Sequence, residues 1–269
     1  MKYQAYKSIL RIKLIAGLQY RVAALAGASI NLFWGLILVK ILMLFYELGR
    51  HQEGGMTLAQ GITYIWLAQC FIGMSSIQTD TEVYQKITSG DFAYELLRPL
   101  DLYTHWYMRA VALRLSNTIL RSSAALIVCI LLPKPYGIQP PVSMEALIAT
   151  IFAFFCALLL SCSFSNIMSA LLIRVELGQG ITSLFYAIVT VLSGMLTPLS
   201  IFPDWLQPLL RLLPFAGLMD LPCSLYTGII PVSQVLLVLF KQLFWTFMMI
   251  LLGRYILTSG LRKTVIQGG

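Results

Sequence analysis

Charge and histidine are scarce in this sequence, and both shortages narrow the functions open to it. Charged residues account for 11% of the 269 residues and hydrophobic residues for 58%, with a mean hydropathy of +0.81. A water-soluble fold of this length could not cover so much apolar surface with polar side chains. The two histidines present also argue against a histidine-based metal centre. The sequence therefore predicts a protein whose solvent is lipid.

The motifs of common nucleotide and enzyme sites are missing as well. No Gly-Lys dipeptide occurs, which excludes a GxxxxGK[ST] phosphate loop, and neither HExxH nor GxSxG is present. The cysteines form no CxxC motif, so we expect small core residues rather than disulfides or metal ligands. They are Cys70, Cys129, Cys156, Cys162 and Cys223.

The eleven acidic residues fall mostly in loops or at the ends of hydrophobic segments. Proton-driven transporters usually bury a carboxylate within the membrane, and no hydrophobic segment has one at its core. This pattern argues against a secondary transporter. It also argues against a membrane enzyme, which needs acid–base or metal residues at one membrane face. A structural membrane subunit stays open as an alternative. If the protein moves a solute uphill, we expect the energy to come from another polypeptide.

Six hydrophobic segments are each near the length of about 20 residues that a helix needs to cross the hydrocarbon core. The sequence therefore predicts an all-α, polytopic membrane protein with one transmembrane domain over residues 1–269. The predicted spans cover residues 22–46, 58–78, 116–132, 146–173, 181–197 and 232–257.

Lysine and arginine are sorted to one side of these spans. Their excess lies near both termini and near residues 80–101, between the second and third spans. By the positive-inside rule, both termini and this segment face the cytoplasm, and an even number of spans agrees with that. The same sorting explains the net charge of +8 without a nucleic-acid partner.

Two segments depart from a plain bundle of spans. Residues 1–21 contain a stretch with polar and apolar faces, which predicts an amphipathic helix on the cytoplasmic leaflet. A charged extension of the first span explains this stretch almost as well. Residues 198–231 contain six prolines and are nevertheless apolar. They predict short helices that re-enter the outer leaflet or pack on top of the bundle.

A short helix is predicted over residues 88–98 in the cytoplasmic segment. Hydroxyl residues can cap its start, and the proline after it limits it to about two turns. Phe92 and Leu96, at i and i+4, give it a small apolar face. Two turns are not stable alone in water, so this face needs a docking surface. That surface is either a partner protein or the bundle to which the helix belongs.

The order of these features resembles the membrane subunit of a type-2 ATP-binding-cassette (ABC-2) exporter, and the resemblance covers essentially the whole chain. It also extends to a bacterial subgroup whose paired permeases export viologens, drugs, peptides or other amphiphiles. The residues that carry it are Ile87–Asp91, Leu96–Leu100, Ser193–Pro198, Phe202–Leu206 and Leu213–Phe215.

The resemblance implies a non-catalytic permease of the inner membrane that exports an amphipathic or hydrophobic molecule. It implies two copies of a separate ATPase that hold ATP and Mg²⁺, and a second permease, either the same chain or a related one. Membrane lipids are the remaining partner, and no cofactor is expected on this chain. The coupling helix would meet the ATPase through Ser89, Gly90, Asp91, Phe92, Glu95, Leu96, Leu97 and Arg98.

Two polar stripes lie on the fourth and fifth spans. Ser161, Ser165 and Ser169 recur at i+4, and we interpret them as helix-packing residues. The stripe on the fifth span is either packing or, by the resemblance, a surface along the substrate path. Its members recur at alternating i+3 and i+4: Ser183, Tyr186, Thr190, Ser193 and Thr197.

Three arginines precede or enter the third span. Arg109 and Arg114 are most simply orientation anchors at the membrane interface. Arg121 lies deepest, and a guanidinium at that depth needs either a polar partner or a path to water.

Overall fold

The computed structural model describes residues 2–49, 56–74, 77, 80–97, 99–175 and 179–262. Within these ranges the chain forms helices joined by turns, with no strand, as the all-α prediction expects. The helices are α1 (Lys2–Leu18), α2 (Arg21–Glu47), α3 (Leu58–Phe71), α4 (Thr81–Ser89), α5 (Phe92–Leu96), α6 (Leu102–Leu131), α7 (Met144–Val175), α8 (Gln179–Leu192), η1 (Leu199–Ile201), α9 (Gln207–Leu212), η2 (Pro214–Leu218), α10 (Asp220–Thr227), η3 (Val232–Gln234) and α11 (Val235–Leu261).

Four helices in the described part of the chain are long and apolar enough to cross a membrane: Arg21–Glu47, Leu102–Leu131, Met144–Ile173 and Val232–Leu261. They match the first, third, fourth and sixth predicted spans. The helices at the second and fifth, α3 and α8, have 14 residues each. Such a helix is about 21 Å long, which is less than the roughly 30 Å of a hydrocarbon core. Six spans therefore stay a prediction.

Helix α6 starts earlier than the predicted third span of residues 116–132. It begins at Leu102, where the Asp101 side chain accepts a hydrogen bond of 2.9 Å from the Thr104 backbone N–H. A carboxylate in this position satisfies an amide that a helix start leaves unpaired. The apolar segment that hydropathy detects begins only after Arg109 and Arg114. The helix itself includes both arginines, because their charges have partners in the structure, which are described below.

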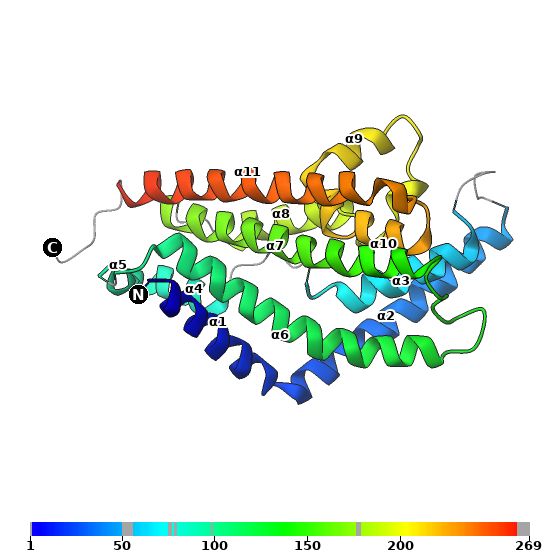
Figure 1. The fold of residues 1–269 in the computed structure, drawn as a ribbon, viewed down its shortest axis with the longest axis horizontal. Coiled ribbons are helices and arrows are strands. Elements are labelled where there is room, and N and C mark those ends of the chain that lie inside the picture. Colours follow the sequence, from blue (N-terminus) through cyan, green and yellow to red (C-terminus); the bar gives the residue numbers. More distant parts are fainter. Residues whose placement is uncertain are drawn as a thin grey trace.

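The bundle is built around α7, which is apolar on nearly all sides and is the most buried of the four long helices. Figure 1 shows α11 running beside α7 over most of its length, with α6 on the other side and α2 and α3 crossing toward the right-hand end. Phe154 of α7 stacks on Phe71 of α3, with ring centroids 4.0 Å apart. Val111 of α6 belongs to the same core cluster, so this cluster fixes α3, α6 and α7 relative to one another.

Helix α1 is a separate element that packs along α6. The chain turns at Gln19 and Tyr20, and α1 and α2 meet there at a sharp angle (Figure 1). The approach to α6 is close, because a Cβ on Gly17 would lie 2.0 Å from the Ser116 Oγ. Residues 1–21 thus include a helix distinct from the first span. Its position at the membrane surface stays a prediction.

Residues 198–231 form a compact block of short helices at one end of the bundle (Figure 1). Its centre is Asp220, whose buried Oδ1 accepts hydrogen bonds from the Tyr64 hydroxyl (3.2 Å) and the Leu199 backbone N–H (3.1 Å). The Tyr64 hydroxyl also donates to the Gly194 carbonyl at 2.9 Å. The Arg211 Nε lies 3.6 Å from the other Asp220 oxygen. Polar contacts therefore hold this block against α3.

Candidate functional site

The predicted helix of residues 88–98 is two helices in the structure, and its predicted start is wrong. Thr88 and Ser89 are the last residues of α4, and α5 covers only five residues from Phe92. Gly90 separates them in the left-handed conformation, with φ of 80°. Glycine adopts this conformation without steric cost and commonly ends helices in this way. Arg98 lies outside the described residues.

The two faces of α5 also differ from the prediction. Phe92 is only 6% exposed and packs in a core cluster with Val83 and Trp106. Its apolar ring therefore stabilises the chain's own bundle, the alternative left open by the sequence. The exposed apolar side chains are Tyr94 (71%) and Leu97 (82%), with Leu96 at 38%.

Tyr94 is therefore a surface residue that the sequence reasoning did not select. The sequence could have indicated Tyr94 through its spacing of three residues from Leu97, because residues i and i+3 share a helix face. Next to this face, the Ser89 hydroxyl donates to the Asp91 carboxylate at 2.7 Å. A Cβ on Gly90 would meet nothing within 4 Å, so the tip between α4 and α5 is open. We define the α5 docking face as Tyr94, Leu96 and Leu97.

Glu95 points to the opposite side of α5 and is buried, with an exposure of 5%. Its carboxylate accepts hydrogen bonds from the Lys86 Nζ (2.7 Å) and the Trp106 Nε1 (2.6 Å). Burial alone raises the pKa of a carboxyl group. These two donors outweigh it and lower the pKa of Glu95 below its usual value. An ionised Glu95 therefore ties α5 to α4 and α6.

A chain of ion pairs extends from Glu95 to α1. The Arg109 guanidinium contacts Glu82 and lies 2.7 Å from the Asp80 carboxylate. Glu82 also accepts from Lys86 at 3.0 Å and from Lys13 of α1 at 3.2 Å. Hydrogen bonding by Arg109 is the largest influence on Glu82 and lowers its pKa. We call these residues the ion-pair network: Lys13, Asp80, Glu82, Lys86, Glu95 and Arg109.

The ion-pair network is balanced, with three carboxylates against three cations. Its members belong to α1, to α4 and its cap, to α5 and to α6. Partly buried pairs of this kind are screened less by salt than surface pairs. Because the network joins α5 to α6, a displacement of α5 acts on α6 through these ion pairs. It also acts through the core cluster that contains Phe92 and Trp106. Arg109 is more than the orientation anchor that the sequence suggested.

The structure changes the polar stripe predicted on the fifth span of residues 181–197. Helix α8 ends at Leu192, and Gly194 turns the chain with φ of 79°. Thr197, beyond this turn, therefore leaves the helical face that the spacing predicted, whereas the Ser193 N–H still donates to the Val189 carbonyl at 2.8 Å. Ser193 is fully buried, with its hydroxyl donating to the Thr190 carbonyl at 3.3 Å. The remaining members of the stripe are on α8: Ser183, Tyr186 and Thr190.

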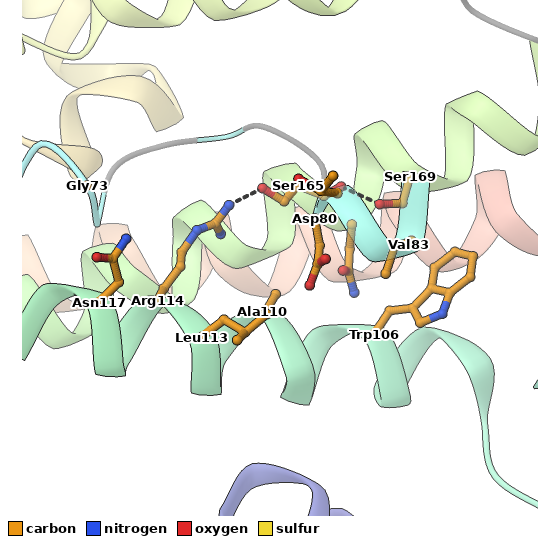
Figure 2. Close-up of a pocket in the computed structure, with 12 residues that line it drawn as sticks. Gly73, Asp80, Val83, Trp106, Ala110, Leu113, Arg114, Asn117, Ser165 and Ser169 are labelled. Carbon is orange, nitrogen blue, oxygen red and sulfur yellow. Dashed lines mark hydrogen bonds between the residues drawn. The ribbon is translucent and has the colours of Figure 1, made fainter. Parts of the chain in front are cut away.

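Arg114 and Arg121 both reach neighbouring helices. The Arg114 guanidinium donates to the Ser165 hydroxyl and, at 3.3 Å, to that of Ser161. Two residues of the stripe on α7 thus accept hydrogen bonds from a cation, beyond the packing role predicted for them, whereas the Ser169 hydroxyl donates to the Ser165 carbonyl at 3.1 Å (Figure 2). Arg121 donates to the Gly27 carbonyl and to the Asn31 Oδ1, both at 2.9 Å. These are the polar partners that its depth required.

Within the described ranges, no group of three or more His, Cys, Asp or Glu side chains is arranged to hold a metal ion. The long apolar helices define instead a multi-pass membrane protein with a charged cluster at one end of its bundle. A family model described as "ABC-2 family transporter protein" matches residues 29–268. The chain therefore belongs to the ABC-2 transporter family. Comparisons with curated proteins and with solved structures gave no match.

Membership makes the chain a membrane component of a transporter, and such components are generally not catalytic themselves. It also implies an ABC ATPase as the partner that hydrolyses ATP. The sequence analysis expected the energy for transport to come from another polypeptide, because no predicted span has a carboxylate at its core. An ABC ATPase as the partner agrees with that expectation.

Proposed function

We propose that the chain is the permease subunit of an ATP-driven exporter and that the α5 docking face receives the motion of its ATPase. The observation that carries the proposal is the pairing of two features on one short helix. One side of α5 is apolar and exposed, while the other is fixed to α4 and α6 through Phe92 and Glu95. An element that docks on one side and is fixed on the other transmits a displacement.

The coupling set therefore consists of the exposed tip and the docking face, with Ser89, Gly90 and Asp91 at the tip. Phe92 and Glu95 transmit the displacement instead of touching the partner. ATP and Mg²⁺ belong to the ATPase, of which two copies would serve a pair of permeases, and the second permease is this chain or a related one.

The positions of three segments support a cytoplasmic location for both termini and for α4 and α5. The Tyr6 hydroxyl of α1 accepts from the Asp101 backbone N–H at 3.0 Å. Arg254, near the end of α11, donates to the Thr104 hydroxyl at 2.8 Å. The start of α1, the start of α6 and the end of α11 thus meet at one end of the bundle. That end is the one the positive-inside rule assigns to the cytoplasm of the inner membrane.

The cargo is amphipathic or hydrophobic, a small molecule, drug or peptide of the kind exported by the viologen, drug and peptide subgroup. Few charges line the helices, so a strongly polar solute would lose its hydration without compensation. The part of its path on α8 would be formed by Ser183, Tyr186 and Thr190. Six crossings, two of them made by the short helices α3 and α8, complete the proposed topology.

The test is a purification of the tagged full chain from its native membrane in mild detergent, followed by mass spectrometry and an ATPase assay. We expect an ABC ATPase subunit to co-purify and to hydrolyse ATP with sensitivity to vanadate. A second permease in the same complex identifies a heterodimer. An unrelated tagged membrane protein from the same host is the control. A folded chain that purifies alone and without ATPase activity contradicts the proposal.

A further inference from the structure

Helix α1 presents an exposed face that the proposed coupling mechanism does not use. Two cations, Lys7 and Arg11, are exposed on it one turn apart. Ile12 (64% exposed) and Ile15 (49% exposed) lie beside them. Spacings of three and four residues connect these positions, so they share one side of the helix. We define the basic face of α1 as Lys7, Arg11, Ile12 and Ile15.

The opposite side of α1 is fixed to the rest of the chain. The Tyr6 hydroxyl accepts from the Asp101 backbone N–H at 3.0 Å, and the Lys13 ammonium lies 3.2 Å from the Glu82 carboxylate. Leu10 packs against the core cluster shared by α3, α6 and α7. An amphipathic helix normally buries its apolar side in the leaflet, whereas α1 uses that side to pack on the bundle. Contact with a membrane surface therefore involves the basic face.

The cations near the basic face are not paired with carboxylates in the described residues. None of the ion pairs there includes Lys7, Arg11 or the exposed Arg21, which follows the turn after α1. The sequence contains no Asp or Glu before Glu47, so neither α1 nor the segment that follows it supplies a carboxylate until the end of α2. The positive charge of this face therefore suits an anion from outside the chain.

The connectivity of the chain keeps the basic face beside a membrane. Only Gln19 and Tyr20 separate α1 from α2, which is long and apolar enough to cross a membrane. Helix α1 thus stays within reach of the leaflet at which α2 begins. Lysine and arginine next to exposed aliphatic side chains are typical of helices that lie at a membrane surface, and anionic lipids attract such helices.

We propose that the basic face of α1 binds anionic phospholipids of that leaflet. Lys7 and Arg11 pair with the lipid phosphates, and Ile12 and Ile15 contact the boundary of the acyl chains. A zwitterionic lipid offers the isoleucines the same contact but brings no net charge, so the face selects anionic lipid. The proposal holds whether or not the chain is coupled to an ATPase, so the two proposals fail separately.

The test uses the purified full chain in nanodiscs of phosphatidylcholine, with and without phosphatidylglycerol of the same acyl chains. Hydrogen exchange locates the effect, and native mass spectrometry measures which lipid the chain retains. We expect phosphatidylglycerol to slow exchange in α1 and to be retained in preference to phosphatidylcholine. The double variant Lys7→Gln and Arg11→Gln should lower this preference about tenfold or more, because each basic residue at an anionic surface contributes about fivefold.

The matched control exchanges the two cations, as Lys7→Arg with Arg11→Lys, which keeps both charges and should keep the preference. Ile12→Ser with Ile15→Ser removes apolar contact without changing the charge, so it should weaken the retention of both lipids alike. Added salt screens exposed charges and should lower the preference of the wild type, a measurement that needs no substitution.

Equal retention of the two lipids by the wild type overturns the proposal and leaves the basic face to an acidic surface of a partner protein. An undiminished preference in the Lys7→Gln and Arg11→Gln variant overturns it too, provided that the thermal midpoint in phosphatidylcholine matches the wild type.

Discussion

Gly90 sets the geometry of the tip that we assign to the ATPase. Its φ of 80° is a left-handed conformation, and open space surrounds the position where a Cβ would be. An alanine there would thus be strained by its backbone alone, without a collision. The residue matters because its conformation ends α4 and lets α5 begin in a new direction.

We expect Gly90→Ala to destabilise the chain by about 1–2 kcal/mol, the cost of a left-handed conformation for a residue with a Cβ. Gly180→Ala is the matched control. Gly180 lies inside α8 with nothing near its potential Cβ, so alanine should stabilise by about 0.4–1 kcal/mol. Thermal unfolding in detergent measures both. Equal midpoints for the two variants would show that Gly90 does not need its conformation.

The lowered pKa values of Glu82 and Glu95 predict how the free energy of unfolding depends on pH. Both have a pKa lowered in the folded state, so their contribution is present above the unfolded value of about 4.3 and is lost as pH falls through the folded pKa. Burial opposes the charge of Lys86, but its two carboxylate partners raise its pKa. Its contribution is present below about 10.4, the unfolded value, and is lost above that.

The thermal midpoint of the wild type should therefore be flat between about pH 5 and pH 10 and fall on either side. Glu95→Gln should lower the midpoint within this window and weaken its dependence on acid. Glu47→Gln, which changes an exposed carboxylate at the end of α2, should leave both unchanged. A midpoint in Glu95→Gln that follows the wild-type curve at every pH would exclude Glu95 from the ion-pair network.

At the scale of elements, the two sides of α5 differ in burial: Phe92 lies in the core and Tyr94 lies on the surface. Phe92→Ala should destabilise by about 3–5 kcal/mol because it empties a core position, whereas Tyr94→Ala should change stability by less than about 0.5 kcal/mol as a surface substitution. Thermal unfolding of the two variants is the measurement. A stable Phe92→Ala variant would place the ring on the surface, at the ATPase contact that the resemblance implied for it.

The long helices could be predicted from hydropathy, because each buries or exposes to lipid a continuous apolar segment. The start of α6 was missed because Arg109 and Arg114 look like the end of a span until their partners are known. Those partners are far away in sequence: Asp80 is 29 residues from Arg109, and Ser165 is 51 residues from Arg114. The break at Gly90 was predictable in principle, since Asp80 is a good N-cap residue and glycine commonly ends helices. The exposed and buried sides of α5 depend on tertiary packing, which a two-turn pattern does not specify.

At the scale of the whole molecule, one end of the bundle gathers the charged residues and the docking face. The ion-pair network connects α1, α4, α5 and α6 there, while the short helices of residues 198–231 occupy the other end (Figure 1). A displacement of α5 thus reaches α6, and α6 packs on α7 and on α2. This arrangement suits a permease driven from that end, as proposed above.

The measurement that tests this account most directly is the amount of ATPase subunit retained by permease variants during purification in mild detergent. The double variant Tyr94→Ala and Leu97→Ala should lower retention about tenfold or more, as loss of central interface residues does, with permease yield and thermal midpoint unchanged. The control is Trp205→Ala with Leu209→Ala, an exposed aromatic and leucine pair at the opposite end, which should retain the ATPase fully. Wild-type retention in the α5 double variant would contradict the assignment of α5 as the coupling element.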